Sequence, residues 1–262
     1  MTPKLGKQGK RILVIALVIL AVVSIGWIAY QFNQGTKLSE RHDYSYSIDL
    51  SYTTIIENVT LLVPVPELDG IPFLADVLMN GTGYGIPPDW NLSIVEVNGT
   101  PMLVVWAARM VPEYHGIPIP VEPGASPSET PPPTASEYSD ATPILMPVQI
   151  VATGTTDVTI NTRHPLGHEP VFNPDGQFTL TSAIPPTYQG EQYAHIVPIY
   201  IAYTSDRPAT VSLHASITGT NSIWRGGWIY NTYEDSITVE LGDTTGWVEC
   251  KGILLIAEGV YW

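Results

Sequence analysis

The chain begins with one long apolar segment, and most of the remaining sequence alternates between apolar and polar residues. Ile12–Phe32 contains no charged residue over its 21 positions, and four basic residues precede it, Lys4, Lys7, Lys10 and Arg11. At about 1.5 Å per residue, a helix of this length crosses a hydrocarbon core of roughly 30 Å. The pattern therefore predicts a transmembrane helix over residues 12–32, preceded by a basic cytoplasmic tail over residues 1–11.

After a polar spacer (residues 33–43), the segment Tyr44–Tyr52 alternates between apolar and polar residues, which is typical of a half-buried strand. Similar segments recur to the end of the chain, and Pro72–Met79 can form one short helix. About a dozen strands predict an all-β fold over residues 44–262, a β-sandwich of immunoglobulin-like or jelly-roll style. The expected strands are Tyr44–Tyr52, Glu57–Val65, Leu92–Val97, Thr100–Ala107, Val148–Ala152, Asp157–Thr162, Gln177–Ser182, Tyr193–Thr204, Ala209–Thr218, Ser222–Trp224, Trp228–Tyr233, Ser236–Leu241 and Trp247–Ala257.

The sequence also predicts the turns and loops between these strands. Asn98-Gly99 lies between two of the expected strands and predicts a type I′ hairpin, because both residues tolerate positive φ. Asn173-Pro-Asp-Gly176 and Gly226-Gly227 predict further turns. The segment 112–147 holds ten of the 24 prolines, which predicts an extended loop or a linker between two β domains.

Two other fates of the apolar segment compete with a permanent anchor. A cleaved signal peptide needs small residues before the cut, and Ser24 and Gly26 supply them poorly. A pilin-like precursor would be cut after Gly9, which leaves Lys10 and Arg11 ahead of the apolar run. Trp27 and Tyr30 lie near the outer end of the segment, where an aromatic belt marks a membrane interface. They favour an uncleaved anchor.

The charge distribution indicates orientation and excludes one class of partner. The first 35 residues hold four basic and no acidic residues, which leaves seven basic against 25 acidic residues, a net charge of −18, in the remainder. Basic flanks stay on the cytoplasmic side, so we expect the C-terminal domain outside the cell. An acidic domain is repelled by nucleic-acid phosphates, so no nucleic acid is expected as a partner.

Four N-glycosylation acceptor patterns agree with this orientation. They begin at Asn58, Asn80, Asn91 and Asn98, and all lie between residues 58 and 100. We therefore expect an extracellular glycoprotein on the cell surface.

Few residues of the sequence are candidate reactive groups. His164, His168 and Glu169 can converge on a metal, yet Pro165 and Gly167 exclude the helical spacing of zinc proteases. The one cysteine, Cys250, lies in an expected strand and is interpreted as a buried thiol. No hydrolase nucleophile pattern occurs, so we expect no enzymatic activity, no catalytic residues, no resident metal and no cofactor.

Aromatic residues offer a better binding hypothesis. In a hairpin that turns on Gly226-Gly227, Arg225 faces Trp228 and can form a cation–π pair with it, and Ile223 faces Tyr230. An exposed row of Trp228, Tyr230 and Arg225 can stack on sugar rings. Ordinary cross-strand packing is the alternative.

A short stretch resembles a known class of proteins. Gly83-Tyr-Gly-Ile-Pro-Pro-Asp-Trp90 and Val95-Glu-Val-Asn-Gly-Thr-Pro-Met-Leu103, in an acidic and lysine-poor ectodomain, resemble uncharacterised membrane-anchored archaeal surface proteins. The resemblance covers about a tenth of the chain in specific residues and implies no catalytic or binding residue.

The sequence thus predicts a single-pass cell-envelope protein with a structural or adhesive role. Its expected partners are membrane lipid, through residues 12–32, and either further copies of itself or envelope proteins and glycans. A pilin-like filament subunit and an anchored carbohydrate-binding domain remain as alternatives.

Overall fold

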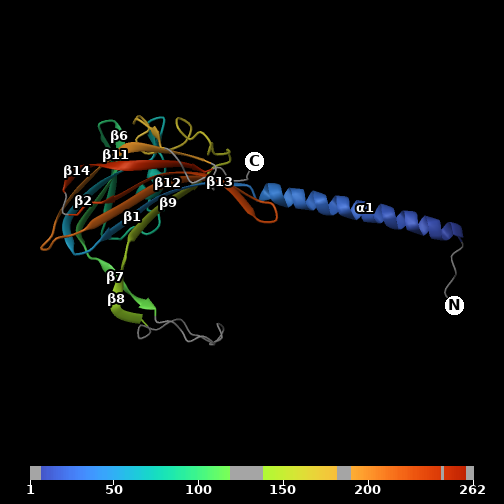
Figure 1. Cartoon of the computed structure of the whole chain (residues 1–262), viewed down its shortest axis with the longest axis horizontal. Coiled ribbons are helices and arrows are strands. Elements are labelled where there is room, and N and C mark those ends of the chain that lie inside the picture. The colour runs from blue at the N-terminus through green and yellow to red at the C-terminus, as the bar shows by residue number, and fades with distance from the viewer. Residues whose placement is uncertain (1–6, 119–137, 182–189, 243–244, 258–262) are drawn as a thin grey trace.

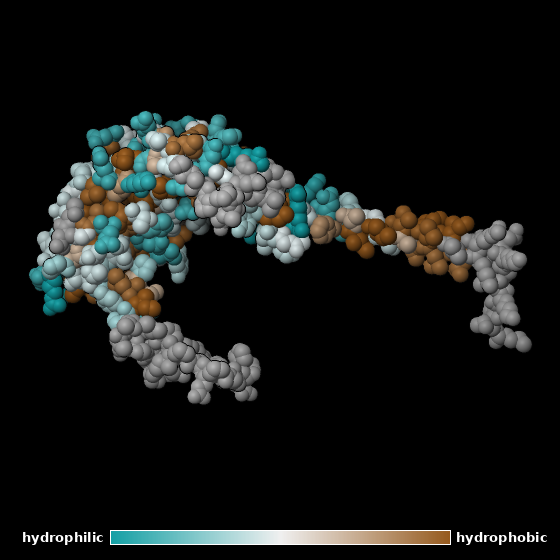
Figure 2. All heavy atoms as spheres, viewed as in Figure 1, coloured by the Kyte–Doolittle hydropathy of each residue, from teal (hydrophilic) through white to brown (hydrophobic). Residues whose placement is uncertain are grey.

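The computed structural model describes residues 7–118, 138–181, 190–242 and 245–257. Helix α1 (Lys7–Leu38) leaves one end of a β-rich domain as a single rod (Figure 1). Its apolar residues form a continuous hydrophobic surface that the domain does not cover (Figure 2). The N-terminal apolar helix is confirmed, and it is long and apolar enough to span a membrane.

The domain is built on one antiparallel sheet of ten strands that curls into a half-barrel (Figure 1). The order across the sheet is β5-β6-β2-β11-β14-β13-β12-β1-β9, and β10 pairs with β11 beside this path. The bounds are β1 Arg41–Tyr52, β2 Ile56–Pro64, β5 Asn91–Val97, β6 Thr100–Met110, β9 Val148–Thr155, β10 Thr179–Thr181, β11 Gly190–Thr204, β12 Val211–Trp224, β13 Trp228–Glu240 and β14 Gly246–Ala257. The predicted all-β class with an N-terminal helix is confirmed.

The layer against the inner face of the sheet is not a second large sheet. This irregular layer consists of helix α2 (Ala75–Met79), the ribbon of β3 (Glu67–Leu68) and β4 (Ile71–Pro72), and the connection from β9 to β10. Val171 in that connection pairs with Glu67 of β3, and Tyr84 pairs with Val151 of β9. Irregular chain therefore lies where a sandwich would place its second sheet.

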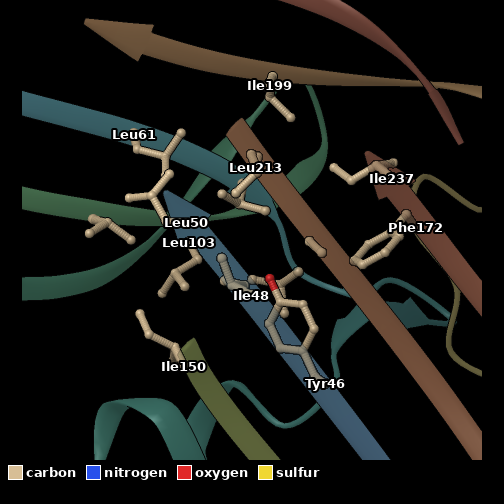
Figure 3. Close-up of a cluster of buried hydrophobic side chains, with 14 of the residues drawn as sticks. Tyr46, Ile48, Leu50, Leu61, Leu103, Ile150, Phe172, Ile199, Leu213 and Ile237 are labelled. Atoms are coloured by element: carbon tan, nitrogen blue, oxygen red, sulfur yellow. The ribbon is translucent and has the colours of Figure 1, made fainter. Parts of the chain in front are cut away.

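The core follows from the alternation of residue types along each strand. On β1, Tyr46, Ile48 and Leu50 are buried, and the residues between them are half-buried. These side chains meet Leu213 of β12 and Phe172 of the irregular layer (Figure 3). The period-two pattern in the sequence thus decides which face of each strand lies inside.

The hairpin at Asn98-Gly99 is confirmed, because both residues have positive φ (53° and 89°) between β5 and β6. Other boundaries differ from the prediction. Asp157–Thr162 is not a strand, and the two segments predicted on each side of the Gly226-Gly227 turn are single long strands, β12 and β13. The predicted strand at Asp157–Thr162 is wrong because its backbone bonds to side chains rather than to a neighbouring strand.

Two connecting segments are more ordered than the sequence predicts. Helix α1 continues to Leu38 and β1 begins at Arg41, so the predicted spacer over residues 33–43 is mostly helix and strand. The proline-rich segment contains a separate ribbon, β7 (Glu113–Pro118) with β8 (Tyr138–Met146), and its central part lies outside the described residues.

Candidate functional site

The turn between β12 and β13, where the sequence places the stacking residues, contains one more residue than predicted. Trp224 pairs with Trp228 and Ile223 pairs with Ile229, so Arg225–Gly227 form the loop. The amide of Arg225 donates to the carbonyl oxygen of Gly227 at 2.9 Å, and Gly226 has a φ of +80°. The predicted register, with Arg225 opposite Trp228 and Ile223 opposite Tyr230, is wrong because a three-residue loop replaces the two-residue turn.

The hairpin nevertheless carries an exposed aromatic face. The exposed fractions of Trp224, Trp228 and Tyr230 are 43%, 52% and 60%. The rings of Trp224 and Trp228 form an edge-to-face pair with centroids 5.9 Å apart. The cation over Trp228 is Arg41 of β1, whose guanidinium carbon lies 5.9 Å from the ring centroid, so the predicted pairing of Arg225 with Trp228 is wrong. Local sequence does not signal Arg41, because the arrangement of strands brings it there.

This hairpin lies beside the end of α1 that enters the domain (orange in Figure 1). The amide of Trp224 donates to Oγ of Ser39 at 2.9 Å, and that hydroxyl donates to the carbonyl oxygen of Thr36 at 2.6 Å. A shallow cleft separates the hairpin loop from the helix. Its lining residues are Phe32, Asn33, Thr36, Lys37, Glu40, Ile223 and Arg225.

The three predicted metal candidates do not form a site. His164 and His168 are exposed, whereas Glu169 is buried. The carboxylate of Glu169 accepts from the hydroxyl of Tyr44 and from the amide of Asn161. Over the described ranges, no group of three or more His, Cys, Asp or Glu side chains is placed to hold a metal ion. The role of Glu169 is to bind the irregular layer to the sheet.

A buried pair of hydrogen-bonded side chains lies on the inner face of the sheet, apart from the residues that the sequence proposes as a site. Nε2 of His195 lies 2.8 Å from Oδ1 of Asp235, and neither side chain is exposed. Oδ2 of Asp235 accepts from the amide of Phe172 at 2.8 Å. Burial raises the pKa of Asp235, and the hydrogen bond with His195 opposes this shift.

Glycine makes room for this pair. Gly252 on β14 lies directly opposite His195, and a Cβ there would come within 2.3 Å of Nε2. The His195 ring stacks on Phe178 with centroids 4.3 Å apart. The alternation of Tyr233, Asp235 and Ile237 along β13 is the sequence signal that could have placed the carboxylate inside.

A second buried polar group holds the same irregular layer. Oδ1 of Asn221 accepts from the amide of Ile160 at 2.9 Å and lies 2.7 Å from Nδ1 of His42. Nδ2 of Asn221 donates to the carbonyl oxygen of Ile160 at 2.8 Å. The hydroxyl of Tyr233 donates to the carbonyl oxygen of Pro170 at 2.9 Å. Sheet side chains thus satisfy the backbone of buried chain that has no strand partner.

These buried groups are not accessible to a substrate. The His195 and Asp235 side chains are fully buried, and burial raises the pKa of the Cys250 thiol to about 11. A thiol in that state is a poor nucleophile at neutral pH, in agreement with its interpretation as a buried apolar group. The aromatic side chains of the hairpin, in contrast, are accessible for contact.

The four predicted glycosylation asparagines are exposed. Asn58 lies on β2, Asn80 follows α2, and Asn91 and Asn98 lie at the two ends of β5. Their amide groups can therefore be reached from outside.

Comparison of the chain with protein families, with curated proteins and with solved structures finds no match.

Proposed function

We propose that the protein is a single-pass membrane protein in which α1 anchors the half-barrel domain outside the cell. The observation that carries this proposal is the exposure of α1. Its large apolar side chains between Leu13 and Phe32 are 52–67% exposed, and the domain covers none of the spanning stretch. A helix that is apolar on all sides requires an apolar surrounding, and for a rod that stands free of its domain this surrounding is lipid.

The orientation is argued from charge and from the acceptor asparagines. The tail before the span is basic, whereas the domain after residue 35 has a net charge of −18. The exposed asparagines at positions 58, 80, 91 and 98 suit modification on the outer side. We therefore assign the N-terminus to the cytoplasm and the domain to the cell surface.

The role that fits this placement is structural or adhesive within the cell envelope. The buried titratable side chains on the inner face, including Asp235 and Glu169, accept hydrogen bonds from backbone amides of the irregular layer. They explain how the domain holds its shape and supply no reactive group at the surface. We infer contacts with envelope proteins, envelope glycans or further copies of the chain.

The exposed helix also suits a second candidate function, a subunit of a surface filament. In that case α1 would pack against copies of itself after cleavage following Gly9. Exposed Trp228, Tyr230 and Arg225 leave carbohydrate binding as a third candidate.

Membrane extraction and intact mass together test the proposal. We expect the protein to stay with membranes through an alkaline carbonate wash and to dissolve in detergent. We also expect external protease to digest the domain in intact cells and the mass to show an uncleaved N-terminal segment. A variant without residues 1–32 is the matched control and should become soluble. Release of the full chain by carbonate would contradict the anchor, and a chain that starts at Lys10 would favour the filament.

A further inference from the structure

We propose that the tip of the β12–β13 hairpin is a second membrane contact, in which Trp224 and Trp228 lie among lipid headgroups and Arg41, Arg225 and Lys37 face lipid phosphates. This proposal rests on the proposed function, because it needs α1 to span the membrane. It adds a lipid-binding surface on the domain itself.

The first argument is the level of the hairpin along α1. Arg225 and Ile223 line a cleft together with Phe32, the last residue of the apolar run, and with Lys37 one turn beyond it. If Phe32 marks the hydrocarbon boundary, the headgroup layer above it is about 5–7 Å thick. Along the helix axis, Asn33 to Lys37 lie about 1.5–7.5 Å beyond Phe32. The hairpin loop therefore lies at the height of the headgroups.

The second argument is that the junction holds the hairpin in that place. Only Ser39 and Glu40 separate α1 from β1. Ser39 accepts a hydrogen bond from the amide of Trp224, and its own amide donates to the carbonyl oxygen of Thr36 at 3.1 Å. A flexible spacer would allow the domain to move away from the membrane, whereas this junction directs the hairpin tip along the helix.

The third argument is composition. Tryptophan and tyrosine are enriched at membrane interfaces because one part of each ring system is apolar and another part forms hydrogen bonds. Here Trp224, Trp228 and Tyr230 share one exposed face of the hairpin. A water-exposed cluster of this kind costs free energy that a headgroup layer would recover.

The fourth argument is charge. Seven basic residues follow residue 35, and three of them, Lys37, Arg41 and Arg225, gather at the junction. The other four lie at positions 109, 163, 207 and 251. Basic residues near a membrane surface are attracted to anionic lipid headgroups. Glu40 is the acidic residue of the cleft. A cationic edge on an otherwise acidic domain suits anionic headgroups.

Quenching of tryptophan fluorescence by lipids with a nitroxide on the headgroup tests the proposal. The full chain with Trp27→Phe is reconstituted into vesicles of phosphatidylcholine and phosphatidylglycerol that contain this lipid. Further replacement of Trp224 and Trp228 by Phe is expected to remove about half or more of the quenched fluorescence. The matched control replaces Trp106 and Trp247, which are exposed to 44% and 52% on other parts of the domain, and should leave the quenched amount unchanged.

A second arm tests the basic residues. The contribution of Trp224 and Trp228 to quenching is expected to fall when phosphatidylglycerol is omitted, and when Arg41 and Arg225 are replaced by Gln. Equal quenching with and without Trp224 and Trp228 would overturn the proposal. So would a Trp228→Ala change that abolishes binding on a glycan array while the hairpin remains unquenched, because it would assign the surface to sugars.

The experiment distinguishes a wrong assignment of α1 as the membrane anchor from a wrong assignment of the hairpin as a lipid contact. Wild-type Trp27 is quenched by lipids brominated in the acyl chain whenever α1 spans the bilayer. Quenching of Trp27 without quenching of Trp224 and Trp228 overturns the hairpin contact and leaves the anchor intact. A full chain that does not float with vesicles overturns both.

Discussion

Two regions of this protein reverse the usual distribution of residue types, and they do so in opposite ways. Helix α1 and the β12–β13 hairpin place large apolar side chains on the outside. The inner face of the sheet places His195, Asp235 and Asn221 inside. The first reversal requires a partner outside the chain, whereas the partner of the second lies within it.

The difference lies in what each region leaves unsatisfied. Most polar atoms of these inner groups bond to each other or to backbone atoms of Ile160 and Phe172, which offsets the cost of burying them. Nδ1 of His195 is buried without a hydrogen-bond partner. The apolar surface of α1 has no such compensation within the domain. The buried polar groups therefore hold the irregular layer against the sheet. The exposed apolar groups indicate where the protein contacts lipid or another molecule.

Loss of the buried carboxylate is expected to have the largest effect. Asp235→Ala leaves the amide of Phe172 and Nε2 of His195 without their partner in the interior, and we expect a loss of about 3–5 kcal/mol in unfolding free energy. Urea unfolding of the full chain in detergent micelles measures it.

Glu234→Ala is the matched control for that change, because Glu234 precedes Asp235 and is only half-buried. It should change stability by less than about 0.5 kcal/mol. Equal losses for the two variants would show that Asp235 does not hold the irregular layer.

A charge in the middle of α1 should have the next largest effect. Leu20→Arg places a guanidinium near the centre of the span, and insertion scales assign this about 2.5–3.5 kcal/mol. The fraction of the chain that resists carbonate extraction should fall, whereas Leu20→Ile should leave it unchanged. Unchanged retention of Leu20→Arg would contradict the spanning assignment of α1.

The sequence predicts the sheet better than the layer against it. Strict alternation places Tyr46, Ile48 and Leu50 on the inner face, and Asn98-Gly99 specifies its own turn. Both signals are local. The connection 156–178 has no comparable local signal, because its backbone is held by side chains from distant strands, such as Asn221 and Asp235. Local sequence therefore predicts a strand at residues 157–162, where the structure has none.

The exposed aromatic face of the β12–β13 hairpin shows the same contrast between local signals and contacts from distant strands. Local sequence singles out Trp228, Tyr230 and Arg225, and these residues lie together on one hairpin as expected. The register and the partner cation depend on loop length and on β1, so Arg41 could not be found from the hairpin sequence alone. Likewise, Trp224 lies on the exposed face beside Trp228 because the loop has three residues, which the sequence of the turn does not specify.

A smaller effect is expected at the glycine opposite His195. Gly252→Ala would place a Cβ within 2.3 Å of Nε2, so the ring must move away from Asp235. We expect a loss of about 1–3 kcal/mol in unfolding free energy. Gly227→Ala is the control, because no atom lies within 4 Å of its Cβ position. Equal stability of both variants would show that the inner face tolerates displacement of the pair.

The smallest effect on folding is expected at the exposed aromatic face. Trp228 contributes an edge-to-face contact with Trp224 and a cation–π contact with Arg41, both at the surface. Trp228→Ala should therefore lower the unfolding free energy by about 0.5–1.5 kcal/mol in detergent. Trp90→Ala is the matched comparison, because Trp90 is 8% exposed and packs in the core, and there we expect about 3–5 kcal/mol. If Trp228→Ala were as destabilising as Trp90→Ala, the aromatic face would belong to the folding core of the domain. A small loss would show that these rings contribute little to folding, so that their exposure is explained by contact with lipid rather than by the core of the domain.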